Sequence, residues 1–483
     1  MSEAEVTEMT VLSEEETEDP HTEEALTPNF EAPEPEAPMP LVSTAELPRG
    51  TGLILPRSGA SPIQDRLVAA NAAARRVALQ QLATWFPGYD FEDAAQNVDA
   101  RRFCVLALRD ALLDHLGGEE IVDRLLSDHL HNWGLGGISF SHGDVKGHQP
   151  PPAFAAQGSR LNNMGWIQLG GLARALDEQW TAILNGADQF IPELREVSMA
   201  LAQVFAAPIN TNIYISYGPS KGFGAHWDNH DTIIVPIRGQ KRWSLFEPAL
   251  LSPELPWNGP EVSDKSLWDG VIEPGTALFI PRGWGHVVEG SDDLSIHCTI
   301  GINRIEVHEL LERIGFEAGY WPALRADVPY DVRAEVTSYD GSVFDDPHSL
   351  GRTLAEVATT EMAERAIATH RARQVRLLSR PFSDAFRAVA RGDWSGLAVR
   401  LTAPAGVMLA AENEPESNVV FAFGDCAVRV AAPALEAFLA VVDCRPWAVE
   451  DLPPVGAEED RRAEFARMLV STGMATVDRL PDR

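Results

Sequence analysis

The sequence predicts an α+β fold in which short β-strands form a barrel in the middle of the chain, with helices before and after it. Residues 212–217 alternate polar and apolar side chains, which is the pattern of a half-buried strand. Further runs of strand length, at 232–237, 277–280 and 294–300, are separated by turns that contain glycine or proline. The segments on either side of this region instead space their apolar residues as helices do.

The N-terminal part of the chain is predicted to contain a tail and a helical extension. Residues 1–48 contain fourteen acidic residues and no Lys or Arg, and residues 31–40 repeat Glu, Ala and Pro. Such a composition has little to bury, so residues 1–50 are predicted to be a disordered acidic tail. Residues 51–130 are predicted to be helical. The helices expected there span 63–85, 99–116 and 119–130.

The chain has 483 residues, more than one compact core usually holds, so further units are expected after these. The barrel is predicted to span residues 131–303, with two helices inside it at 172–184 and 191–205. Residues 304–380 are predicted to be helical again. The clearest helices there are expected at 307–316 and 354–378.

Residues 381–483 have the order of elements of a winged helix. Strands are expected at 406–409, 419–423 and 473–477, and helices at 433–441 and 463–471. This segment contains sixteen acidic residues and ten Lys or Arg, a net charge of −6. A helix that reads DNA would carry the opposite sign, so a scaffold or partner-binding role is predicted for this domain.

The strongest candidate for chemistry is a set of three metal ligands. His226 and Asp228 are two positions apart, and on a β-strand such residues point to the same face. His286 follows sixty positions later, far enough to come from another strand of the barrel. Two imidazoles and one carboxylate on one side of an ion hold Fe(II) and leave the other side open. The sequence therefore predicts a catalytic iron site.

The region 212–302 resembles a known family, the JmjC-type double-stranded β-helix of the ribosomal oxygenases. These enzymes are cupin-like Fe(II)- and 2-oxoglutarate-dependent hydroxylases. The matching motifs follow one another in the family's order. They are H-W-D-x-x-D at 226–231, G-Q-K-R-W at 239–243, P-G-x-x-L-F-I-P-R-G-W-x-H at 274–286 and S-I-H-x-T-I at 295–300.

The resemblance implies a role for each matching position. His226, Asp228 and His286 would hold the iron, and 2-oxoglutarate and O₂ would be the co-substrates. Lys241 would pair with the distal carboxylate of 2-oxoglutarate through a charge-assisted hydrogen bond. Arg242, the next residue, is the rival for that role.

Polar residues of one strand are expected to line the same pocket. Asn212, Tyr214 and Ser216 share a strand face by parity. The resemblance places Asn212 and Tyr214 in the 2-oxoglutarate pocket. His230 and His297 are expected to be pocket-wall residues, because a fourth ligand would block the position that an oxidant needs.

Charge and composition indicate the class of partner. The net charge is −32, of which −18 remains once the tail is left out, so an electrostatic grip on nucleic acid is not expected. A basic protein or peptide complements such a surface better. The sequence has no apolar stretch of membrane-spanning length and no basic-then-apolar signal. Its four cysteines have no C-x-x-C spacing, and a cytoplasmic location is expected.

The function predicted is hydroxylation of a protein or peptide side chain. By resemblance, the favoured substrate is a ribosomal protein residue such as Arg or His. Gly301 stands where the family often has Ser, which leaves the substrate side chain open. One alternative is a hydroxylase that tailors a natural-product peptide, and another is a non-catalytic cupin-like protein in which the metal has a structural role.

A homodimer is predicted to form through the helical region 304–380. Apolar residues recur there at helical spacing and need a surface to cover them, which a second copy would supply. They are Val307, Leu310, Leu311, Ile314, Leu354, Val357 and Met362. The alternative is that these helices pack on the barrel of their own chain.

Overall fold

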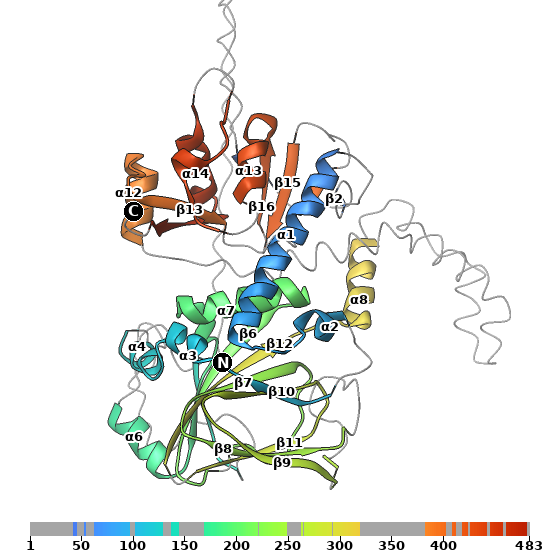
Figure 1. Cartoon of the computed structure of the whole chain (residues 1–483), viewed down its shortest axis with the longest axis vertical. Helices are drawn as coiled ribbons and strands as arrows, with labels where there is room; N and C mark the ends of the chain where they lie inside the picture. Colours follow the sequence, from blue (N-terminus) through green and yellow to red (C-terminus); the bar gives the residue numbers. More distant parts are fainter. Residues whose placement is uncertain are drawn as a thin grey trace, which may run out of the picture. The chain divides into compact units, whose positions relative to one another are not determined.

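The computed structural model describes the chain in segments. They are residues 42–45, 53–54, 62–96, 102–128, 137–143, 169–248 without 221, 262–318 without 264 and 292, 382–401, 408–411, 418–423, 426–441, 445–456 and 460–480. The chain divides into two compact units, Met1–Met39 and Pro40–Arg483. All of the described residues belong to the second unit, whose elements are labelled in Figure 1.

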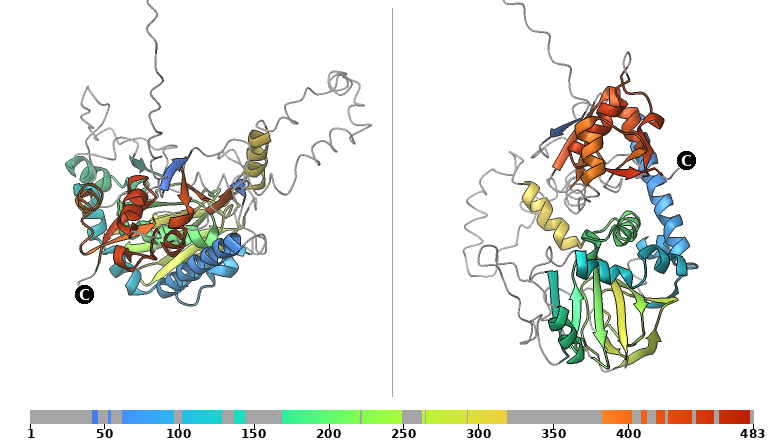
Figure 2. Two further views of the ribbon diagram at one scale, coloured as in Figure 1. Left: turned by 90° about the horizontal axis from the view of Figure 1, so that it is seen from above. Right: turned by 90° about the vertical axis from the view of Figure 1, so that its left-hand side faces the viewer.

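The centre of the described chain is a large antiparallel sheet. Its strands run side by side in Figure 2 in the order β3, β10, β7, β12, β6, β5, β4. They are β3 (Cys104–Ala107), β10 (Thr276–Ile280), β7 (Asp231–Arg238), β12 (Leu294–Ile302), β6 (Ile209–Tyr217), β5 (Thr181–Leu184) and β4 (Ile138–Ser141). The central strands lie in the segment where the sequence predicts a barrel. The alternating pattern of polar and apolar residues in that segment suits a sheet with two different faces.

A smaller antiparallel sheet faces the large one (Figure 1). It consists of β11 (His286–Gly290), β8 (Lys241–Phe246) and β9 (Ser266–Ile272), in that order. Apolar side chains of the two sheets meet between them, among them Ile234 and Leu278 from the large sheet and Trp243 and Leu245 from the small one. The predicted α+β fold with a core of facing antiparallel sheets is confirmed.

Strand parity separates the apolar core from a polar interior. On β6, Ile213 and Ile215 are buried in the main hydrophobic core, which also contains residues of helix α7 (Pro192–Phe205). The alternate residues of β6 face the space between the sheets. On β12 the same rule places Cys298 in the core and its neighbour His297 in the polar space.

Helices cover the core face of the large sheet, and most of their buried apolar residues belong to the main core, whereas Ala74 of the first helix belongs to the core of the C-terminal segment. They are α1 (Pro62–Trp85), α2 (Phe91–Gln96), α3 (Asp110–Leu116), α4 (Glu120–Asp128), α6 (Leu169–Asp177) and α7. The predicted helices at 63–85, 119–130 and 191–205 correspond to α1, α4 and α7. None of the described helices has the length and apolar character needed to cross a membrane.

Two predicted helices are wrong in part. Within 99–116, residues Cys104–Ala107 form strand β3, which pairs with β10 at the edge of the large sheet, and only α3 is helical. Within 172–184, helix α6 ends at Asp177, and β5 follows, paired with β4 and β6. Gln179 has a left-handed φ of 66°, which stops the helix. In both cases pairing with a distant strand decides between helix and strand.

The C-terminal segment contributes to two further sheets. Several of its strands and helices lie where the sequence predicts them. One sheet has the order β17 (Trp447–Ala448), β13 (Leu397–Leu401), β18 (Ala475–Arg479). Its core includes residues of α12 (Phe382–Arg391), α13 (Leu435–Val441) and α14 (Arg462–Ser471). Helix α12 was not predicted.

The predicted disorder of residues 1–50 is wrong at residues 42–45. Strand β1 (Val42–Ala45) pairs antiparallel with β16 (Cys426–Ala431). Strands β15 (Asn418–Phe423), β14 (Met408–Ala411) and β2 (Leu53–Ile54) continue the same sheet. The acidic composition does not extend to Val42, Ser43 and Thr44, and Val and Thr favour strands. A segment from the start of the chain thus completes a sheet near its end.

The predicted helix at 307–316 corresponds to α8 (Val307–Ala318). The second helix predicted in that region, at 354–378, lies outside the described residues. The predicted winged helix and dimerisation region remain predictions.

Candidate functional site

The three predicted metal ligands lie together between the two sheets. Their nearest ligand atoms are all within 4.8 Å of one another, and Nε2 of His286 is 3.7 Å from Oδ2 of Asp228. His226 and His286 face each other across a two-residue antiparallel bridge. The amide of His226 donates to the carbonyl of His286 at 3.0 Å, and the amide of His286 donates to the carbonyl of His226 at 2.7 Å.

The strand-parity argument for His226 and Asp228 is wrong, although the residues are brought together. Both residues lie in the connection between β6 and β7, where His226 makes only the isolated bridge to His286. The carbonyl of Asp228 accepts a hydrogen bond from the amide of Gly283 at 2.8 Å, in the turn that leads to His286.

Both imidazoles present the same nitrogen for a ligand. Nδ1 of His226 lies 2.8 Å from the carbonyl oxygen of Gly224, and Nδ1 of His286 lies 3.1 Å from that of Trp284. A carbonyl oxygen can only accept, so each Nδ1 donates and each Nε2 keeps its lone pair free. Such outer hydrogen bonds fix the tautomer and the ring direction of metal-binding histidines.

The charge states also suit a cation. Burial is the largest single influence and raises the pKa of Asp228, but the imidazoles of His286, His226 and His230 together lower it more, so the net direction is downward. Burial, assisted by His226, lowers the pKa of His286 to about 4. At neutral pH the site therefore offers one carboxylate and a neutral His286, which are the forms that bind metal. Two nitrogens and one oxygen fit Fe(II), whereas a structural zinc site would close with a fourth ligand.

A cavity of about 270 Å³ extends from the ligands into the space between the sheets. Its wall contains Asn212, Tyr214, Ser216, Asn210, Asn185, Asn229, His230, Thr181, Ser220, Thr232, Thr299, Lys241, Trp243 and His297, together with the three ligands. All of the predicted pocket residues line this cavity. Its described wall has many amides and hydroxyls, and Asp228 is the only acidic residue among the described residues that line it.

Lys241, and not Arg242, points into the cavity. Lys241 is buried, and its Nζ donates to Oγ of Ser216 at 2.8 Å. Burial lowers the pKa of Lys241 to about 7. Arg242 is on the opposite face of β8, with its side chain 59% exposed and 2.6 Å from Asp269. The alternation of β8 thus places Lys241, and not Arg242, at the cavity wall.

Lys241 has no acidic partner among the described residues. The hydroxyl of Ser216, which accepts the hydrogen bond from Lys241, is itself 3.0 Å from Oγ1 of Thr181 on β5. A buried ammonium with only hydroxyl partners is unfavourable, so this end of the cavity suits an anion.

Asn212, Tyr214 and His297 of the cavity wall each make a different kind of contact. Oδ1 of Asn212 accepts from the amide of Gly186 at 3.0 Å. The ring of Tyr214 stacks on that of His297, with centroids 4.8 Å apart. Burial and the charge of Lys241 lower the pKa of His297 well below its ordinary value, and its buried Nδ1 makes no hydrogen bond within the described part of the chain. A neutral imidazole donor or acceptor is therefore available to a bound molecule.

Gly301 makes room for His230. A Cβ atom at this position would lie 2.6 Å from Oδ1 of Asn210 and 2.8 Å from Cδ2 of His230, closer than real Cβ contacts. The missing side chain thus lets His230 and Asn210 occupy the wall where a serine would stand in the resembling family.

Several wall residues were not predicted. Asn210 shares the parity of Asn212, so the same strand argument could have found it. Thr181 could not be found because it lies in a segment predicted as helix. Asn185 and Ser220 lie outside regular strands, and no periodic signal marks them.

Residues 186–310 match the family model of the JmjC domain. The chain is 28% identical over 167 residues to the "bifunctional lysine-specific demethylase and histidyl-hydroxylase NO66" of Brugia malayi, which is 33% of this chain and 24% of that protein. It is 30% identical over 125 residues to the protein of the same name from Drosophila persimilis, which is 24% of this chain and 18% of that protein. The chain thus spans less than a quarter of the length of these relatives.

Similar solved structures include that of ycfD from E. coli, with 16% identity and a TM-score of 0.48 over 81% of this chain and 98% of that one. Another, with 17% identity and a TM-score of 0.48 over 82% and 99%, is described as the E. coli ribosomal oxygenase YcfD in complex with cobalt and 2-oxoglutarate. The matched residues 186–310 contain all three candidate ligands and also strands β6, β7, β8 and β12, which contribute residues to the wall of the cavity. The part of the chain that resembles a JmjC domain therefore contains the candidate site.

Proposed function

We propose that this protein is an Fe(II)- and 2-oxoglutarate-dependent dioxygenase that hydroxylates a protein or peptide side chain. One observation carries the proposal. The three ligands His226, Asp228 and His286 and the buried Lys241 line the same cavity. A site with a purely structural metal would have no role for a buried ammonium that lacks an acidic partner among the described residues.

The residues divide the chemistry between them. His226, Asp228 and His286 would hold Fe(II) on one side, which leaves positions for a chelating co-substrate and O₂. The iron, when bound, supplies the activation of O₂ that accompanies the decarboxylation of 2-oxoglutarate to succinate. The chain's own contribution is to fix the ligand directions through the Gly224 and Trp284 carbonyls.

Lys241 would orient the co-substrate. Its ammonium would donate to the distal carboxylate of 2-oxoglutarate, with Ser216 as a neighbouring hydroxyl. Asn212 and Tyr214 line the same cavity and would complete the polar wall around the dicarboxylate.

Similarity and charge support the substrate class. The relatives from Brugia malayi and Drosophila persimilis are named as enzymes that modify lysyl and histidyl residues. The motif order of 226–300 favours a ribosomal protein residue, and the net charge of −32 favours a basic partner. We therefore infer a basic protein, with a ribosomal protein as the favoured substrate.

The test is succinate formation by the purified protein with Fe(II), 2-oxoglutarate and O₂. We expect slow turnover without substrate, and its loss in His226→Ala and Asp228→Ala while the far-ultraviolet circular dichroism stays unchanged. Asp269→Ala is the control, because this carboxylate lies on the outer face of β9 beside Arg242. Iron-dependent succinate formation that survives in either ligand variant would exclude the assignment.

The substrate is found by mass spectrometry of cellular proteins with and without the active enzyme. A peptide that gains one oxygen atom only with the wild-type protein, and not with Asp228→Ala, would identify it. The proposal of a ribosomal substrate fails if the modified peptides come from other proteins.

A further inference from the structure

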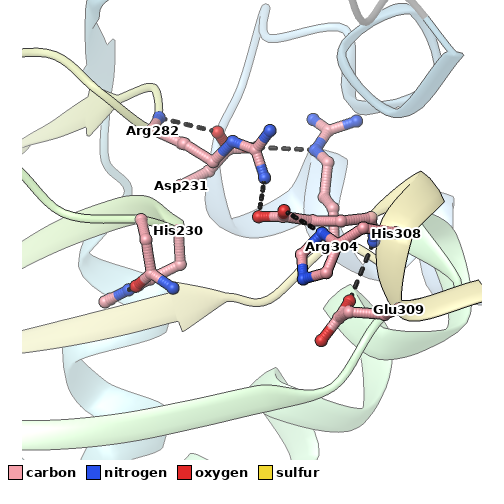
Figure 3. Close-up of polar contacts among 8 residues, drawn as sticks. His230, Asp231, Arg282, Arg304, His308 and Glu309 are labelled. Atoms are coloured by element: carbon pink, nitrogen blue, oxygen red, sulfur yellow. Dashed lines mark hydrogen bonds and ion pairs between the residues drawn. The ribbon is translucent and has the colours of Figure 1, made fainter. Parts of the chain in front are cut away.

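Asp231 is a fully buried carboxylate close to the metal ligands. It is the first residue of β7, three positions after Asp228, and its side chain is 0% exposed. Its Oδ1 accepts from the backbone amide of Arg282 at 2.9 Å, and its Oδ2 lies 2.6 Å from Nε of Arg304 (Figure 3). A buried carboxylate is unfavourable unless a positive charge and hydrogen bonds compensate it. Loss of either contact would therefore be costly, which holds Asp231 in this position.

The hydrogen bond to Arg282 joins the two segments that carry the ligands. The amide of Arg282 docks on the Asp231 carboxylate, and the next amide, that of Gly283, docks on the carbonyl of Asp228. Gly283 has a φ of 83°, which glycine adopts without strain. His286 follows three positions later and is fixed by its bridge to His226. The segments 226–231 and 281–286 are therefore joined by backbone and side-chain hydrogen bonds at both ends.

Arg304 anchors the carboxylate to the helices. Its two terminal nitrogens donate to the carbonyls of Ala94 at 2.7 Å and Ala95 at 3.2 Å, at the end of α2. Its guanidinium also lies 4.9 Å from the ring centre of Phe205, at the end of α7. Asp231 is thereby fixed relative to the helices that cover the large sheet, and it holds the Arg282 amide at the same place.

We propose that Asp231 is a positioning residue for the metal centre, which sets the separation of Asp228 and His286 by holding the backbone of Arg282. The inference rests on the proposed function, since it takes the three ligands to be a metal site. Asp231 is not among the described residues that line the cavity. Its effect on metal binding belongs with that of other outer partners of metal ligands, whose loss costs about 10- to 100-fold in affinity.

The side chain of Arg282 provides a matched control. It pairs with Glu306, which also lies 2.9 Å from Nδ1 of His308 (Figure 3). Arg282→Ala removes this ion pair from the same turn but keeps the backbone amide that Asp231 holds. A second control is Asp384→Ala, which breaks a carboxylate–arginine pair with Arg479, 2.7 Å away, in the C-terminal segment.

The experiment is calorimetric titration of Co(II) into the metal-free full-length protein, with thermal unfolding of each variant. We expect Asp231→Ala to bind Co(II) about 10- to 100-fold more weakly than the wild type. Arg282→Ala and Asp384→Ala should keep the wild-type affinity even where their unfolding temperature falls. Asp231→Asn should be intermediate, because an amide can accept from Arg282 or face Arg304 correctly but not both.

Four results would overturn the inference. One is a folded Asp231→Ala with wild-type Co(II) affinity. If that variant does not fold, wild-type affinity in Asp231→Asn has the same meaning. Equal losses in Asp231→Ala and the controls would reduce the effect to general destabilisation. A wild-type protein that binds no Co(II) would remove the proposed function together with this inference, whereas the other results leave the metal site standing.

Discussion

Two residues of opposite charge line the cavity, and their charges are influenced by different surroundings. Asp228 keeps a lowered pKa because three neighbouring imidazoles together outweigh the effect of its burial. Lys241 has no such compensation, and burial lowers its pKa to about 7. The carboxylate is therefore stabilised by the protein as it stands, whereas the ammonium gains its stabilisation from a bound anion.

Lys241→Ala tests the role of this ammonium. We expect the apparent KM for 2-oxoglutarate to rise by roughly 10- to 150-fold, which corresponds to a charge-assisted hydrogen bond of about 1.5–3 kcal/mol. Arg242→Ala is the matched control, because its side chain points out of the cavity and should leave the KM unchanged. Steady-state kinetics of succinate formation measures both. The assignment is reversed if Arg242→Ala raises the KM and Lys241→Ala does not.

The affinity for 2-oxoglutarate should depend on pH through Lys241. The protonated side chain binds the carboxylate, and burial lowers its pKa in the free protein to about 7. Binding raises the pKa of Lys241 above this value. The affinity is therefore constant at pH values below the pKa of the free protein, and it falls by about tenfold per pH unit as the pH rises through that pKa. His297, which faces the same side chain, does not titrate in this range because its pKa is well below the ordinary value.

Titration of 2-oxoglutarate binding between about pH 6 and pH 9 measures this dependence. Lys241→Arg is the informative variant, because a guanidinium stays protonated throughout and should flatten the profile. A wild-type affinity that does not change with pH would contradict the lowered pKa.

At the scale of single elements, β1 has a role that its place in the chain does not suggest. It pairs with β16 through four residues, Val42 to Ala45, and so extends the C-terminal sheet. The compact unit Met1–Met39 ends just before this strand. The acidic segment and the strand can therefore be removed separately.

Two deletions separate their roles. Removal of residues 1–39 should leave both the turnover of 2-oxoglutarate and the unfolding temperature unchanged, because every described element remains. Removal of residues 1–48 also removes β1, and should lower the unfolding temperature without changing turnover, since the cavity is built from other strands. Differential scanning calorimetry and succinate assays measure the two effects. A large fall in turnover on removal of residues 1–39 would show that the acidic segment acts on the JmjC domain.

At the scale of the whole molecule, α8 carries apolar side chains on its surface. Val307 is 75% exposed and Leu311 is 60% exposed, within the residues that the structure describes. We propose that a second copy of the chain covers the region 304–380 that contains them. Light scattering at micromolar concentration should therefore give twice the mass of one chain, and Leu311→Asp should shift the measured mass toward that of a single chain. A wild-type mass of a single chain would remove the dimer.

The C-terminal segment should not bind DNA. Residues 381–483 carry a net charge of −6, and contacts with phosphate groups require the opposite sign. Gel retardation of duplex DNA at physiological salt should show no shifted band. A salt-sensitive shift would support a DNA-binding winged helix instead.

The sequence by itself determined the features that depend on local pattern. The alternation in 212–217 placed Asn212, Tyr214 and Ser216 on one face, and all three line the cavity because strand parity is a property of the backbone alone. The motifs around His226, Asp228 and His286 likewise identified residues that the structure brings within ligand distance of one another.

Only the tertiary structure decided what depends on contacts between distant segments. Whether Lys241 or Arg242 faces the cavity follows from how β8 packs its Trp243 and Leu245 against the large sheet. Residues 104–107 and 181–184 become strands because β10 and β6 offer backbone partners, which outweigh the local spacing of apolar residues. The Asp231 carboxylate meets the Arg282 amide and the Arg304 side chain across more than fifty positions of sequence. Such pairings depend on the folded backbone, and no local pattern encodes them.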